Sequence, residues 1–131
     1  MRNLCLVLCL LASPAHASDV PLSGPAFEAF VLGKTFTYSI DGRPYGAEEY
    51  MENRRVRWSF LDGQCHEGEW FVAGDQICFD YDDIPETQCW TFFLRGGQLA
   101  ARFANNPETT ELYETAQDTD PLFCLGPEVG V

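Results

Sequence analysis

Positive charge and histidine are scarce in this chain. Its 8 Lys and Arg stand against 20 Asp and Glu, which gives a formal net charge of −12, and it has two histidines in 131 residues. The shortage of basic residues argues against binding to nucleic acid or to an anionic membrane surface, because both need a positive footprint. The acidity favours solubility and allows attraction to a cationic protein or envelope component.

Long apolar runs are also lacking, apart from one near the N-terminus. Residues 4–12 (LCLVLCLLA) follow Arg2 and precede an A-x-A box, Ala15-His16-Ala17. The run is too short to cross a bilayer as a helix, and the arrangement is typical of an export signal. We therefore expect residues 1–17 to be a signal peptide that is cleaved near Ala17. Residues 18–131 would then form a single periplasmic or secreted domain without a transmembrane segment.

Four cysteines remain after this cleavage, and an even number in an exported chain predicts two disulfides. Three connectivities are possible. The strand register described below favours Cys78–Cys89 across neighbouring strands and Cys65–Cys124 between the sheet and the tail.

The rest of the chain has the periodicity of strands joined by turns. A short helix over residues 25–32, capped by Ser23, precedes a period-two pattern from residue 34 to residue 114. Turn formers such as Asp41-Gly42 and Gly74-Asp75 recur at short, even intervals. The pattern predicts an all-β domain, an antiparallel meander of about seven or eight strands. The sheet would be either curved and open or an up-and-down barrel, with the helix as a plug and residues 115–131 as a wrapped tail.

A 21-residue repeat supports the meander. Residues 40–60 align without gaps on residues 61–81, so that Asp41-Gly42 falls on Asp62-Gly63 and Tyr50 falls on Phe71. A looser third copy has Phe93 in the matching place. Each copy is a hairpin too small to bury its own apolar face, so the copies should join into one sheet.

Two-residue turns at Asn53-Arg54, Gly74-Asp75 and Gly96-Gly97 would fix the strand register. They pair Met51 with Val56, Val72 with Ile77, and Leu94 with Leu99. One face then collects the apolar core. Glu49 falls on this core face opposite Trp58.

The candidate chemical sites are few. His66 is the remaining histidine, and it cannot pair with Cys65 because neighbours on a strand point to opposite faces. No G-x-S-x-G motif is present, and one histidine with four oxidised cysteines leaves too few zinc ligands. We expect no catalytic constellation, no cofactor and no zinc site.

Acidic residues give two weaker candidates. Four carboxylates cluster in one loop and could hold Ca²⁺, although their spacing does not match an EF-hand and favours a solvated loop: Asp80, Asp82, Asp83 and Glu86. Glu49, if it faces the core, would have a raised pKa and could serve a carboxylate-based enzyme. The alternative is that Glu49 lies at a rim or pairs with an arginine.

The best candidate binding feature is an aromatic stripe on the outer face, formed by Tyr50, Phe71 and Phe93 at equivalent repeat positions. Exposed aromatic residues in a row need cover or a ligand. Such a stripe could stack on a sugar ring or grip a protein strand. The alternative is that the helix, the tail or the disulfides cover it.

Two resemblances accompany these patterns. Asp62-Gly63, residues 67–70 (EGEW) and Gly74 resemble a membrane-occupation-and-recognition (MORN-type) hairpin repeat, which implies stacked hairpins. The mature chain is also similar in layout to a domain-of-unknown-function family of small exported proteobacterial proteins. The matching segments are GKT (33–35), GEW (68–70), GDQIC (74–78), CW (89–90) and CLGP (124–127). This resemblance implies a periplasmic β-domain and no mechanism.

These observations favour a non-catalytic binding or envelope-associated module. Two alternatives stay open: an inhibitor of a cationic hydrolase such as lysozyme, and a carboxylate enzyme that uses Glu49.

Overall fold

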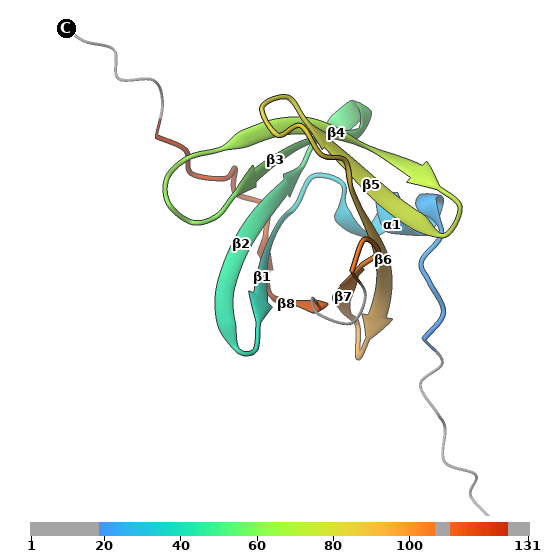
Figure 1. Ribbon diagram of the computed structural model, residues 1–131. Coiled ribbons are helices and arrows are strands. Elements are labelled where there is room, and N and C mark those ends of the chain that lie inside the picture. Colours follow the sequence, from blue (N-terminus) through green and yellow to red (C-terminus); the bar gives the residue numbers. More distant parts are fainter. Residues whose placement is uncertain (1–18, 107–110, 126–131) are drawn as a thin grey trace, which may run out of the picture.

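The protein, seen in a computed structural model that describes residues 19–106 and 111–125, is an eight-stranded barrel with one short helix. The expected signal peptide, residues 1–17, lies outside the described residues. The strands are β1 (Thr35–Ile40), β2 (Arg43–Tyr50), β3 (Arg55–Ser59), β4 (His66–Ala73), β5 (Gln76–Tyr81), β6 (Gln88–Arg95), β7 (Gln98–Phe103) and β8 (Glu111–Asp118). Each pairs antiparallel with the next, and β8 returns to β1, as Figure 1 shows. The all-β meander is confirmed, and it closes as an up-and-down barrel.

Tight turns set most of the register as the sequence predicts. Asp41 and Gly42 both have positive φ, 49° and 75°, which is the backbone that a two-residue hairpin turn requires. The hairpins at Gly74-Asp75 and Gly96-Gly97 pair Val72 with Ile77 and Leu94 with Leu99, as expected.

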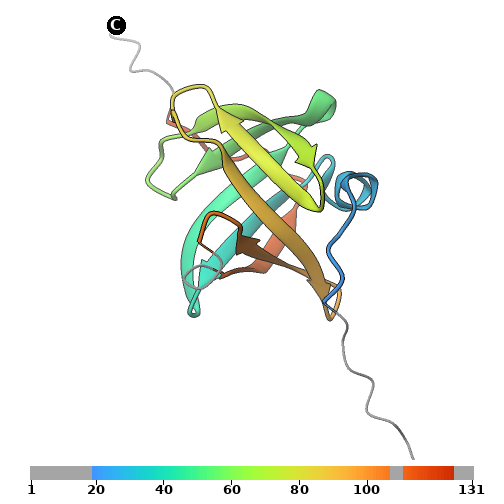
Figure 2. The same ribbon diagram turned by 45° about the vertical axis from the view of Figure 1, so that its right-hand side comes forward.

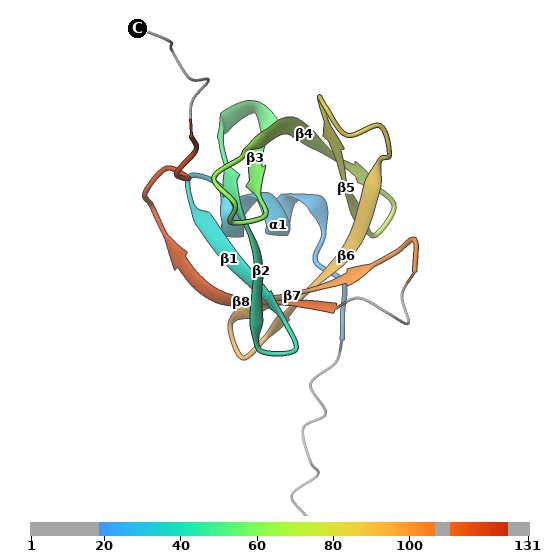
Figure 3. The ribbon, with the colours of Figure 1, turned by 60° about the vertical axis from the view of Figure 1, so that its left-hand side comes forward.

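Helix α1 (Gly24–Val31) closes one end of the barrel. Ser23 caps it, since its Oγ accepts a hydrogen bond from the Ala26 N–H at 3.2 Å. Phe27 is fully buried, with ring centroids of Tyr50, Trp70 and Phe92 at 5.5, 5.2 and 4.5 Å. In Figure 3 the strands form a ring with α1 lying across it, and Figure 2 shows the helix beside the tip of the β4–β5 hairpin. The helix is therefore the plug that the sequence predicts.

The connection between β2 and β3 differs from its predicted form. Asn53 and Arg54 do take positive φ, but Glu52 joins them in a 3-10 turn (η1, Glu52–Arg54), and the Met51 N–H donates to the Arg55 carbonyl at 2.8 Å. The loop has three residues in place of two, so Tyr50 pairs with Val56 and Glu48 pairs with Trp58. Because a shift of one residue turns a strand over, the predicted faces of β2 are wrong.

The two disulfides join the pairs that the sequence predicts. Cys78 and Cys89 lie opposite one another on β5 and β6 and form one disulfide, and Cys65 forms the other with Cys124. The tail begins later than expected because β8 runs to Asp118. Residues 119–125 then cross the outside of the barrel toward the β3–β4 loop, where Leu125 N–H donates to the Gly63 carbonyl at 2.7 Å. Within the described part of the chain, no helix has the length and apolar character needed to span a membrane.

Candidate functional site

The interior of the barrel is not completely filled at the end opposite α1. A cavity of about 60 Å³ lies there, enough for about two water molecules. Its lining consists almost entirely of aromatic and apolar side chains, with one carboxylate: Tyr38, Tyr45, Glu48, Tyr50, Trp58, Phe60, Phe79, Tyr81, Gln88, Trp90, Phe92, Ala101 and Leu112. A small eight-stranded barrel either fills its interior with side chains or holds one small ligand.

Glu48 supplies the carboxyl group of this lining. It faces inward from β2 and is 2% exposed, and the hydroxyl of Tyr81 donates to its Oε1 at 2.9 Å. Its Oε2 has no hydrogen-bond partner among the residues that the structure describes. Burial raises the pKa of Glu48 well above its ordinary value, although the Tyr81 hydrogen bond acts in the opposite direction. A buried acceptor without a partner is costly, so a water molecule, an ion or a ligand is expected to satisfy it.

A pair of tyrosines adds further polar atoms to the same interior. The hydroxyls of Tyr38 and Tyr50 lie 2.8 Å apart and share one hydrogen bond. Burial raises the pKa of Tyr38, Tyr50 and Tyr81, so all three hydroxyls keep their protons at neutral pH. The cavity lining thus holds these three hydroxyl groups and the Glu48 carboxyl group among aromatic rings, and a second buried carboxyl group, Glu114 on β8, also raises the pKa of Tyr38.

Aromatic side chains form the mouth of the cavity. Tyr45 falls where the β1–β2 register shifts, and its ring lies 5.9 Å from Trp58 and 5.8 Å from Phe60. Trp58 and Phe60 are edge to face at 5.4 Å. Gly46 permits this arrangement, because a Cβ at that position would lie 2.1 Å from the Trp58 ring. A bulge beside a site commonly re-aims a side chain, as Tyr45 is re-aimed here.

The comparisons with known proteins give no identity. No family model matches the chain, and neither a curated protein nor a solved structure matches it. The resemblances drawn from sequence motifs therefore stay predictions, and the geometry of the cavity carries the functional argument.

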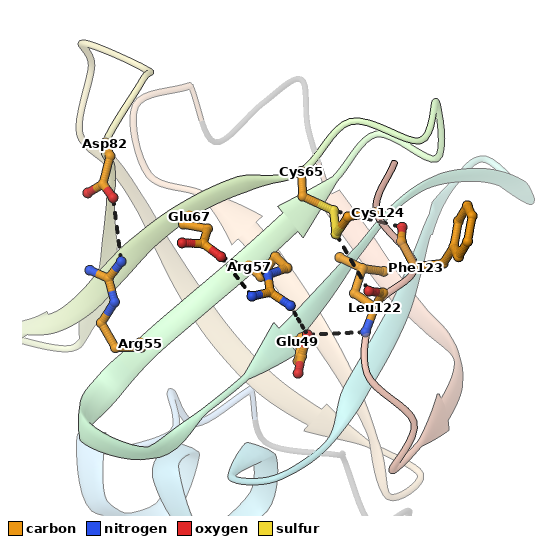
Figure 4. Close-up of polar contacts among 9 residues, drawn as sticks. All are labelled: Glu49, Arg55, Arg57, Cys65, Glu67, Asp82, Leu122, Phe123 and Cys124. Carbon is orange, nitrogen blue, oxygen red and sulfur yellow. Dashed lines mark hydrogen bonds and ion pairs between the residues drawn. A yellow bond between two sulfur atoms is a disulfide. The ribbon is translucent and has the colours of Figure 1, made fainter. Parts of the chain in front are cut away.

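Glu49 lies on the outer surface, and its predicted place opposite Trp58 is wrong. Its Oε2 is 3.4 Å from Nη1 of Arg57, which also contacts Glu67, and it accepts the Leu122 N–H at 3.1 Å. Figure 4 shows Arg57 between the two carboxylates and Glu49 reaching the C-terminal segment. This matches the alternative that Glu49 pairs with an arginine. Its role is to hold residues 119–125 against the barrel.

The aromatic stripe does not exist as one surface. Tyr50 is inside the barrel at 2% exposure, whereas Phe71 and Phe93 point outward from β4 and β6 with β5 between them. Phe71 is 38% exposed. Phe93 is covered by the guanidinium groups of Arg102 and Arg95, at 5.1 and 5.7 Å from its ring centroid. The misplacement of Tyr50 follows from the three-residue loop before β3.

The acidic loop residues are engaged separately. Asp82 forms an ion pair with Arg55 at 3.4 Å, and Asp80 accepts a hydrogen bond from the Thr87 hydroxyl. Oδ2 of Asp83 lies 2.8 Å from Nδ1 of His66. No group of three or more His, Cys, Asp or Glu is placed to hold a metal among the described residues. His66 points inward at the rim, with its ring 5.9 Å from Phe60, as its strand parity predicts.

Sequence reasoning missed Glu48. In the repeat it aligns with Glu69, which lies on the outer surface, so the alignment places it outside. Tyr50 was the signal that could have located Glu48, because the predicted register leaves this large aromatic residue on the outer face. Moving the register of β2 by one residue buries Tyr50 and turns Glu48 inward as well.

Proposed function

We propose that this protein is a binding module that takes one small molecule into the open end of its barrel. The observation that carries the proposal is Glu48, a buried carboxyl with an unpartnered oxygen in a cavity lined by aromatic rings. Sites for small ligands are largely apolar with a few placed polar groups that fix orientation. The cavity has this composition.

Binding without chemistry is the better supported function. General acid–base work on a glycosidic bond uses two carboxyl groups on either side of the substrate. Among the described residues that line the cavity, Glu48 is the single acid. The described residues of the lining include no pairing of a nucleophile with a base either, which supports a binding role over the carboxylate enzyme.

The proposal is tested by asking whether small organic molecules reach the cavity. The three tryptophans report on position, because Trp58 and Trp90 line the cavity whereas Trp70 contacts Phe27 at the plugged end. A ligand in the cavity should shift the indole N–H resonances of Trp58 and Trp90 and leave that of Trp70 in place. A panel of five- to seven-atom alcohols, amines and acids that moves none of these signals would contradict the proposal.

A matched pair of variants separates the cavity from the outer surface. Ala101→Leu adds atoms to the cavity lining and should abolish binding, whereas Ala73→Leu makes the same change at an exposed position at the plugged end. Binding that survives Ala101→Leu in a folded barrel would place the ligand elsewhere.

We also propose that the protein acts outside the cytoplasm after removal of residues 1–17. Two disulfides fit an oxidising compartment. Intact-mass measurement of the protein from its native envelope tests this, since cleavage after Ala17 leaves Ser18 as the first residue.

A further inference from the structure

We infer that the ligand of this cavity is a small alkylammonium cation, whose charged nitrogen binds Glu48 and whose carbon chain lies among the aromatic rings. This inference rests on the proposed binding function and adds the charge and chemical class of the ligand. Four independent features of the molecule support it, and they are taken in turn.

The first feature is the acceptor. Tyr81 already donates to Oε1 of Glu48, which leaves Oε2 without a donor from the described residues. An ammonium group carries three donors and no acceptor, so it supplies what Oε2 lacks. A cation beside the carboxyl also favours its ionised form, which opposes the effect of burial.

The second feature is the wall. Rings of Tyr38, Trp58, Phe79, Tyr81 and Trp90 surround the space, and their faces carry negative electrostatic potential that attracts cations. The cavity lining includes no Lys, Arg or His from the part of the chain that the structure describes. The described lining therefore contains no positive charge that would repel a cation or pair with an anion, and its neutral donors are tyrosine hydroxyls, the Gln88 amide and indole N–H groups.

The third feature is the charge of the mouth. The loops β1–β2, β3–β4 and β5–β6 meet at the open end, and acidic residues dominate them: Asp41, Asp62, Asp82, Asp83 and Glu86. Among the described residues, Arg55 pairs with Asp82 and His66 pairs with Asp83, so Asp41, Asp62 and Glu86 contribute most of the negative charge, with Arg43 nearby. Glu86 lines a groove that shares Tyr45, Gln88 and Trp90 with the cavity. An acidic rim raises the local concentration of cations and speeds their association.

The fourth feature is size. The cavity of about 60 Å³ holds only a few non-hydrogen atoms, and it adjoins the groove with which it shares Tyr45, Gln88 and Trp90. A short linear ion such as pentylammonium can place its charged nitrogen in the cavity and extend its chain toward the groove, whereas a six-membered ring needs roughly 150 Å³ and does not fit in the cavity. The class of ligand is therefore a short amine rather than a polyol or an aromatic cofactor.

The test compares three probes of equal chain length on the unaltered protein with both disulfides formed. Pentylammonium, 1-pentanol and pentanoate are titrated at low ionic strength, with calorimetry for affinity and indole resonances for position. We expect pentylammonium to bind roughly 10- to 100-fold more tightly than 1-pentanol, because a hydrogen bond between charged groups is stronger than one between neutral groups. Pentanoate should bind most weakly, because its carboxylate is repelled by the acidic residues at the open end.

Two adjacent residues supply a matched pair of variants. Glu48→Gln keeps the acceptor for Tyr81 but removes the charge, and it should weaken pentylammonium binding roughly 10- to 100-fold while 1-pentanol binding changes little. Glu49→Gln makes the same change on the outer surface and should leave both affinities unchanged.

The outcomes separate the inference from the proposed function. If 1-pentanol or pentanoate binds in the cavity as tightly as pentylammonium, the cationic class is wrong and the binding function stands. If none of the three binds, both fail. Should Glu48→Gln not fold, the ranking of the three probes on the unaltered protein still decides the question. Pentylammonium binding that survives in a folded Glu48→Gln variant would overturn the inference.

Discussion

The two ends of this barrel are made from the same eight strands but are filled differently. At the plugged end α1 inserts Phe27 among Tyr50, Trp70 and Phe92, so that its ring meets those of Tyr50 and Trp70 edge to face and that of Phe92 at a tilt of 48°. At the open end the strands enclose a cavity that contains the Glu48 carboxyl and tyrosine hydroxyls. One end supplies packing energy and the other retains polar groups whose burial is costly. A division of this kind is expected where one end holds the fold and the other holds a ligand.

The largest expected effect comes from removing the plug. Phe27→Ala takes away a fully buried ring with three aromatic neighbours, and we expect the free energy of unfolding to fall by about 3–5 kcal/mol. Phe60→Ala removes the same ring at the open end, where the side chain is 43% exposed, and should cost about 1 kcal/mol or less. Urea unfolding with the disulfides intact measures both.

Equal costs for these two variants would contradict the comparison. They would mean that the open end is packed as tightly as the plugged end. The cavity around Glu48 would then be too small to matter for binding.

The next effect concerns pH, and it arises at the open end. The pKa of Glu48 is raised in the folded state, so between its unfolded value near 4.5 and its folded value the native protein holds a proton that the unfolded chain releases. Raising the pH through this window therefore lowers the free energy of unfolding, by at most about 1.4 kcal/mol per pH unit. Denaturation measured from pH 5 to pH 7 should show this fall relative to Glu48→Gln.

The tyrosines that face Glu48 do not change their protonation within this pH window. Tyr81 on β5, Tyr38 on β1 and Tyr50 on β2 have raised pKa values and stay neutral throughout it. Glu114 on β8, which acts on Tyr38, is present in both proteins, and its contribution cancels in the difference. Parallel pH profiles for the two proteins would show that Glu48 is not buried as described.

The sequence predicts the helix and the strands better than the side chains that fill the barrel, for a physical reason. Ser23, Pro25 and Gly33 mark the helix, and the period of two marks the strands, because these signals are local. Cys78 and Cys89 are predictable as partners because a short loop joins their strands. The Cys65–Cys124 bridge follows by elimination once that pair is formed.

The lining of the cavity depends on quantities that local patterns do not contain. The face of β2 is set by whether the turn before β3 holds two or three residues, and Glu52 gives no sign that it belongs to the turn. Closure depends on the pairing of β1 with β8, which are far apart in the sequence. The cavity depends on the difference between the volume that the barrel encloses and the volume of its side chains.

The smallest expected effect tests the face of β2 directly. Glu49→Gln weakens a partly buried ion pair with Arg57, which keeps its contact with Glu67, and it should cost about 1 kcal/mol or less and leave the pH profile of unfolding parallel to that of the unaltered protein. Its effect should be confined to residues 119–125, where faster proteolysis would show loosening around Leu122. If Glu49→Gln removed the pH slope and Glu48→Gln did not, then Glu49 would be the buried carboxyl, the two-residue turn at Asn53-Arg54 would be correct, and the open end would have to be rebuilt around Glu49.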